Sequence, residues 1–170
     1  MWLVFCEVRL FMKYREEYFD FEKNIEQEWK KEHKAGGFKC SHCKRWVVIN
    51  NHMGTINRNH CNMCLWSKHV DEQKGDRKAE CQGGMKPIGL TFKYEGVGRQ
   101  GELMLIHECA NCEKISINRI AGDDAGEAIL LIFEESLLKQ NILDKLRQQG
   151  VALLTVADKV RIGTVLFGKK

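Results

Sequence analysis

Cysteine has the clearest pattern in this sequence, because six of its eight cysteines form three Cys-x-x-Cys pairs. The pairs are Cys40–Cys43, Cys61–Cys64 and Cys109–Cys112. Two residues between the cysteines allow a tight turn to direct both sulfurs at one ion, and two such turns complete the tetrahedron that zinc prefers. In a cytoplasmic chain such pairs indicate metal ligands before disulfides. A redox dithiol needs an exposed pair at the start of a helix, and none of the three pairs opens a clear helix.

The first two pairs have the spacing of one closed zinc site. Seventeen residues lie between them, which is within the range of four-cysteine zinc sites. We therefore expect Cys40, Cys43, Cys61 and Cys64 to bind one zinc ion. The spacing does not exclude an interleaved arrangement, in which the first pair meets the third.

The third pair needs two further ligands, and we expect a second zinc ion there. Cys81 is the remaining cysteine nearby, so the predicted ligands are Cys81, Cys109, Cys112 and one histidine. His69 lies twelve residues before Cys81, and we assign it to this site. His107 stays open as the alternative, because it precedes Cys109 by two residues and would point to the same side of a strand.

Basic residues gather around the first two pairs and favour a nucleic-acid surface. The formal net charge is +4, but the thiolates that hold two zinc ions would lower it to about +1. Residues 38–81 contain eight Lys or Arg against four Asp or Glu, whereas residues 82–125 contain five against six. The expected phosphate contacts are Arg58, His60, Lys68, Arg77 and Lys78. Trp46 and Trp66 would stack on bases if exposed, and the alternative is that both pack beside zinc.

Hydrophobic periodicity predicts an α+β fold around these residues. Residues 13–34 have apolar side chains every three or four positions, which is typical of an amphipathic helix. Residues 45–50 are a predicted strand. Three further segments, 88–94, 103–107 and 115–120, predict a three-stranded antiparallel sheet with a Cys-x-x-Cys turn, the form of a zinc ribbon.

The last predicted elements lie on either side of Gly150. Residues 124–149 predict a helical segment. Residues 151–156 and 159–167 are predicted strands, although a helix is not excluded for the first of them. Within the earlier strand 88–94, alternation places Ile88, Leu90, Phe92 and Tyr94 on one face.

The centre of the chain resembles the RNHCP family. The similarity runs through GGFKCSHC (36–43), RNHCNMCLWSKHVD (58–71), GDR (75–77), CQGGMKPIGL (81–90), HECANC (107–112) and NRIAGDD (118–124). The Cys-Pro of the family is here Cys61-Asn62, and Lys74 stands where a proline is expected before GDR; asparagine also suits a tight turn. The resemblance covers roughly half of the chain, and it implies a small zinc-binding domain without naming a reaction.

The expected organisation has three parts. Residues 1–37 form a mainly helical N-terminal extension. Residues 38–125 form the RNHCP-like zinc-binding domain, and residues 126–170 form a C-terminal helix followed by strands. The predicted fold is therefore a small zinc-ribbon-like antiparallel β domain with two zinc sites, flanked by helical and mixed extensions.

Three functions fit these features. The favoured one is a structural-zinc module that contacts RNA or a ribonucleoprotein, the ribosome included, through a basic face around the first site. The second is a protein-interaction module without nucleic acid. The third is a metal-dependent nuclease of the HNH type that would use Asn59, His60, His69 and Asp71. Such an enzyme needs a metal with an open position and a ligand histidine after the last pair, which this sequence lacks, so we assign no catalytic residue.

The first twelve residues decide the expected compartment. They are apolar, but Glu7 and Arg9 interrupt them, no basic segment precedes them, and no small-residue cleavage site follows. The run is also too short to cross a bilayer. We expect a cytoplasmic protein with no membrane partner and no small-molecule substrate. Met12 opens a cleaner amphipathic helix and is an alternative start of translation.

Overall fold

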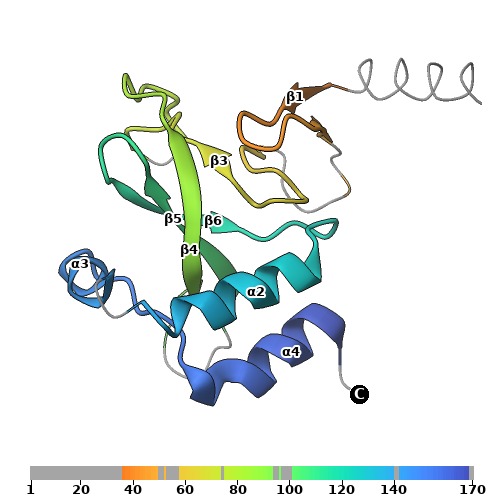
Figure 1. The fold of residues 1–170 in the computed structure, drawn as a ribbon, viewed down its shortest axis with the longest axis vertical. Coiled ribbons are helices and arrows are strands. Elements are labelled where there is room, and N and C mark those ends of the chain that lie inside the picture. The colour runs from red at the N-terminus through yellow and green to blue at the C-terminus, as the bar shows by residue number, and fades with distance from the viewer. Residues whose placement is uncertain are drawn as a thin grey trace, which may run out of the picture.

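The computed structural model describes residues 36–49, 52, 58–73, 75–93, 96, 101–139 and 142–168. The predicted helix over residues 13–34 lies outside this part. The described strands form a two-stranded sheet and a four-stranded antiparallel sheet with the order β3-β4-β5-β6 (Figure 1). The strands are β1 (Gly37–Lys39), β2 (Trp46–Val48), β3 (Ser67–Lys68), β4 (Gly84–Phe92), β5 (Leu103–Cys109) and β6 (Ile115–Arg119).

The three predicted strands of the main sheet are present, and a short fourth strand joins them. β3 follows the second Cys-x-x-Cys turn and pairs antiparallel with the start of β4, with Ser67 opposite Met85 and Lys68 opposite Gly84. The fold is therefore a small antiparallel β domain, as predicted, with one edge strand more than the expected three. This extra strand ties the first zinc-binding region to the sheet.

A bulge in β4 corrects the predicted side-chain alternation. The register of β4 and β5 shifts between Pro87 and Gly89. As a result Ile88 packs in one hydrophobic cluster, whereas Leu90 and Phe92 pack in another. The prediction that Ile88 shares a face with Leu90 and Phe92 was wrong, because one extra residue in a strand moves the following side chains to the opposite face. The fourth predicted residue, Tyr94, lies outside the described residues.

The two hydrophobic clusters lie on the two sides of the sheet. Helix α2 (Gly126–Ser136) buries Ile129, Ile132 and Phe133 against the sheet, at the three- and four-residue spacing of an amphipathic helix. Helix α3 (Leu143–Gln148) contributes Leu146 to the other cluster. Figure 1 shows α2 beside α4 (Lys159–Phe167), with α3 apart from both. The division of the chain into three parts stays a prediction, although its C-terminal part shares these clusters with the sheet.

The C-terminal segment corrects the prediction of two strands. Residues 159–167 form α4, and residues 151–155 form neither strand nor helix. A capping box across η3 (Val156–Asp158) precedes the helix. The Asp158 carboxylate accepts the backbone N–H of Thr155, and the Thr155 side chain accepts the backbone N–H of Asp158. Ile162 is fully buried, and Leu166, one turn later, packs against the same cluster. The β-branched residues of the segment favour a strand, but the cap and the buried stripe favour a helix. No helix in the described part has the length and apolar character needed to cross a membrane.

Candidate metal centres

The three Cys-x-x-Cys turns are built in the same way. In each turn the residue after the second cysteine donates its backbone N–H to the carbonyl of the first, over 2.9 to 3.1 Å. The first cysteine in turn donates its N–H to the carbonyl five residues on, over 2.8 to 2.9 Å. Lys44, Leu65 and Glu113 end the turns with positive φ angles of 65°, 59° and 59°. This left-handed residue closes the turn, so the two sulfurs face the same point.

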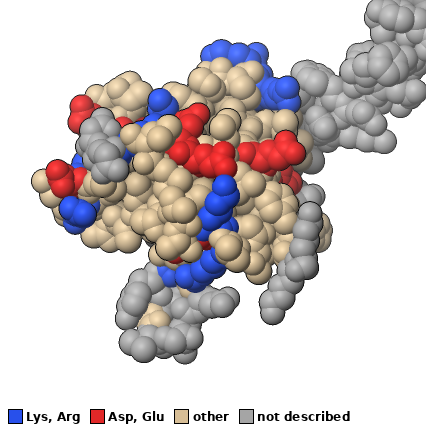
Figure 2. All heavy atoms as spheres, turned by 60° about the horizontal axis from the view of Figure 1, so that its bottom comes forward, with Lys and Arg blue, Asp and Glu red and all other residues tan. Residues whose placement is uncertain are grey.

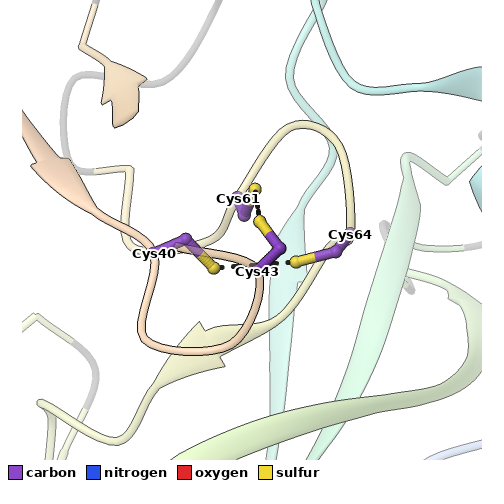
Figure 3. Close-up of side chains that lie close together, drawn as sticks. All are labelled: Cys40, Cys43, Cys61 and Cys64. Atoms are coloured by element: carbon purple, nitrogen blue, oxygen red, sulfur yellow. Dashed lines mark hydrogen bonds between the residues drawn. The ribbon is translucent and has the colours of Figure 1, made fainter. Parts of the chain in front are cut away.

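Site one joins the first two turns. Its sulfurs converge from two loops (Figure 3). Cys40 Sγ lies 3.6 Å from Cys64 Sγ, and Cys43 Sγ lies 3.6 Å from Cys61 Sγ. All four sulfurs lie within 4.8 Å of one another. Four sulfurs at zinc-bond length around one tetrahedral ion stand about 3.8 Å apart, so the cluster fits zinc.

Site two joins the third turn to two ligands from the β3–β4 connection. Cys81 Sγ lies 3.6 Å from Cys109 Sγ, and Cys112 Sγ lies 3.3 Å from His69 Nδ1. The four ligand atoms again lie within 4.8 Å of one another. Three thiolates and one imidazole nitrogen are a common structural zinc set. The two clusters can therefore hold two zinc ions.

The thiols of each site favour a bound cation. Burial opposes ionisation of Cys43, but the backbone N–H of Arg45 and the neighbouring sulfurs outweigh burial and lower the pKa of this thiol to about 7. At site two burial again opposes ionisation, and the backbone N–H groups of Cys112 and Asn111 lower the pKa of Cys109 to about 6. Burial raises the pKa of Cys64. One thiolate thus forms readily in each site, whereas the full set, four thiolates in site one and three in site two, requires the charge of a metal ion.

The structure decides between the alternatives that spacing left open. The first pair faces the second, so the interleaved arrangement is not formed. His69 lies in site two, and His107 does not. His107 is fully buried, with Nε2–H donating to the Leu65 carbonyl at 2.7 Å and Nδ1 accepting from Asn118 Nδ2 at 2.9 Å. Burial lowers the pKa of His107 to about 4, which keeps this bridging imidazole neutral.

Arg58 and His60 correct the predicted phosphate surface. Arg58 is 4% exposed and pairs with Asp123, at 2.7 Å, and with Asp124. His60 is 2% exposed, and its Nε2–H donates to Asp124 Oδ2 at 2.8 Å. The same Asp124 oxygen accepts the backbone N–H of Ala121 at 2.8 Å. These two residues therefore cannot contact phosphates in this fold; they anchor the second turn to the loop before α2.

The other predicted residues lie in three settings. Lys68, Arg77 and Lys78 are exposed, as a phosphate contact requires. Trp66 is half-buried and stacks on His42, with ring centroids 4.1 Å apart; Trp46 is half-buried as well. Two residues of the nuclease hypothesis are also placed: Asn59 gives its carbonyl to Ser67 Oγ at 3.0 Å, and the Asp71 carboxylate accepts the N–H groups of Gly75 and Arg77.

The residues that the sequence analysis did not identify are the hydrogen-bond partners of the buried side chains Arg58, His60 and His107. Asp123, Asp124 and Asn118 lie in the segment NRIAGDD, which the resemblance included without assigning it a role. Asp123 and Asp124 lie 65 and 66 residues from their ion-pair partner Arg58, so no local spacing indicates these contacts. Asn118 bonds His107, eleven residues away. His42 also has no distinguishing signal in the sequence beyond its place in the Cys40–Cys43 turn.

Comparison with known proteins supports this reading of the site. A family model of the RNHCP domain matches residues 35–130. No curated protein and no solved structure matches the chain significantly. The matched region includes every ligand of both sites and the network of Arg58 and His60. Since the match covers more than half of the chain, this protein belongs to the RNHCP domain family.

Proposed function

We propose that this protein is a zinc-stabilised module that binds RNA through the surface around site one. The observation that supports the proposal is the charge of the two segments that build the site. Residues 36–49 and 58–70 contain no Asp or Glu. Their exposed cations are Lys39, Lys44, Arg45 and Lys68.

These cations keep the surface basic after zinc is counted. A zinc ion with four thiolates has a net charge of about −2, which four exposed cations outweigh. Within the described residues, no ion pair forms between these cations and a carboxylate, so their charge is available to a ligand. Phosphates are the natural ligand of such a surface, because each contact releases a counterion.

The surface near site two is less suited to phosphate. Arg77 and Lys78 lie on a loop that also contains Asp71, Glu72, Asp76 and Glu80. The helical side of the molecule has mixed charge too: Figure 2, with the bottom of Figure 1 turned forward, shows acidic and basic side chains together. Ion pairs there include Lys159 with Glu134 at 3.3 Å and Lys139 with Glu135 at 3.5 Å. The proposed contact therefore stays centred on site one and depends less on Arg77 and Lys78.

The test is the salt dependence of RNA binding. Fluorescence polarisation of a labelled RNA should give a logarithmic affinity that falls linearly with the logarithm of salt concentration. Arg45→Gln with Lys68→Gln should weaken binding and reduce the slope by about 2, close to one per phosphate contact removed. Lys139→Gln is the control: it removes a cation that lies just after α2 and is already paired with Glu135, and it should change neither quantity. No binding at low salt, or an unchanged slope in the double variant, would contradict the proposal.

The two alternative functions, a protein-interaction module and a nuclease, differ in how well the structure fits them. A protein partner without nucleic acid stays a prediction, and exposed Leu131 and Val160 on α2 and α4 are compatible with it. The nuclease hypothesis needed His60 and His69 together at an open metal position. His60 bonds Asp124, and His69 faces the sulfurs of site two. His60 is thus part of the buried network with Asp124, and His69 is part of site two, so the two histidines do not share one metal site.

A further inference from the structure

The turn of site one and the start of the main sheet meet through a stack of aromatic rings. His42 and Trp66 are parallel within 4°, with centroids 4.1 Å apart. Trp66 also packs on Gly84 of β4, where a Cβ atom would lie 3.3 Å from the ring atom Cζ3. Trp66 is half-buried, whereas His42 is exposed. The accessible ring surface of this stack is therefore that of His42.

The position of His42 is fixed from two sides. It is the second middle residue of the Cys40–Cys43 turn, so both flanking cysteines hold its backbone when zinc is bound. The Trp66 ring fixes its side chain. An exposed ring that is already ordered loses little conformational entropy on binding, which favours a flat aromatic ligand.

Two lysines point to the face of the sheet on which Trp66 packs. Lys68 is the register partner of Gly84, and residues opposite each other in a sheet point to the same side. Lys86 stands two residues after Gly84 on β4, before the bulge, and therefore points to that side too. Both lysines are exposed. Glu108, the register partner of Lys86, is itself paired with Lys145. An exposed aromatic ring with cations on the same face matches a base and its phosphates.

We propose that the outer face of the His42 ring binds an unpaired nucleobase, so that the ligand is single-stranded RNA and not duplex. This inference rests on the proposed function and makes it more specific. A base in a duplex is stacked on its neighbours and does not offer its face, whereas a single strand can place one base on His42 and its phosphates near Lys68 and Lys86. Stacking of this kind tolerates different bases, because every base has a π face.

The experiment compares three ligands on the zinc-loaded full chain. They are a labelled oligouridine of about twelve nucleotides, a duplex RNA of equal length, and a strand of equal length whose central nucleotides are abasic. The oligouridine should bind tightest. The abasic strand keeps the phosphates and should bind about 5- to 150-fold more weakly, which is the range of one base–aromatic stack. This comparison needs no variant of the protein.

Two substitutions at one position complete the test. His42→Ala should weaken oligouridine binding by a similar factor, and His42→Phe, which keeps a flat ring, should bind within about threefold of the wild type. Native mass spectrometry should find two zinc ions in both variants, because His42 is not a ligand. Equal binding of all three ligands, together with an unchanged affinity of His42→Ala, would overturn this inference and leave the phosphate surface standing. Failure of all three ligands to bind at low salt would overturn both.

Discussion

The two metal sites use the same turn but have different surroundings. Site one consists of two such turns, and its surrounding cluster contains Val47 and Phe38 besides its own cysteines. Site two uses one turn, at the end of β5, a strand that is buried along most of its length. Apart from Leu65, which is buried in the main core, site one has few apolar contacts, whereas site two is attached to a sheet with an extensive core. We therefore expect zinc to contribute more to local stability at site one. The same Cys-x-x-Cys turn is therefore expected to contribute differently to local stability, depending on the apolar contacts around it.

The largest effect is expected from removing one zinc ligand from each site in turn and comparing the two variants. Cys61→Ser should lose one zinc ion and expose the amides of β1 and β2 to hydrogen exchange at least about a hundredfold faster, because this zinc supplies most of the local stability. Cys112→Ser should also lose one zinc ion but leave β1 and β2 protected. Native mass spectrometry and hydrogen-exchange mass spectrometry measure both quantities. If Cys112→Ser made the amides of β1 and β2 exchange as fast as Cys61→Ser does, the expectation that site one keeps its structure without zinc in site two would be wrong.

The next effect concerns the anchor of site one to the loop before α2. Arg58→Ala should lower the free energy of unfolding by about 3–5 kcal/mol, because it leaves the buried Asp124 carboxylate without its guanidinium partner. Arg119→Ala is the matched control: its pair with Glu102, at 2.8 Å, is exposed, so its loss should cost less than about 1 kcal/mol. Urea unfolding of the zinc-loaded proteins measures the difference. Equal losses in the two variants would mean that the buried network adds nothing beyond a surface pair.

The smallest effect is expected from making site two resemble site one. His69→Cys should keep both zinc ions and change the free energy of unfolding by roughly 1 kcal/mol or less, because zinc accepts thiolate and imidazole alike. In the cobalt-substituted protein the sulfur-to-metal charge-transfer absorption should rise, since seven thiolates become eight. His69→Ala is the control and should lose the second ion. A second ion lost from His69→Cys as well would show that site two requires the longer side chain of histidine.

The ligand sets could be read largely from local spacing. A Cys-x-x-Cys turn is closed by hydrogen bonds within six residues, so its sulfurs converge in almost any surrounding fold. The strand segments at 88–94 and 103–107 were also predictable, because their apolar residues are dense and hairpin-forming glycines lie between them. The choice of His69 over His107 was weaker, since both histidines stand near cysteines in the sequence.

The roles of Arg58 and His60 could not be read locally. A basic residue beside a zinc turn is usually solvated, and the acidic partners of these two lie more than sixty residues away. The bulge at Pro87 and Gly89 and the helix α4 were missed for a related reason. In both cases the pattern of apolar residues was compatible with two structures, and contacts across the core selected one of them.

The sequence alone thus determined which side chains can hold metal and that a small antiparallel sheet supports them. These features depend on hydrogen bonds and side-chain periodicity within short stretches of chain. Only the tertiary structure decided which turns face each other, which histidine becomes a ligand, and that Arg58 and His60 are buried against Asp124 while His42 is left exposed. These outcomes depend on contacts between segments that are far apart in the chain, where burial and charge pairing outweigh local preference.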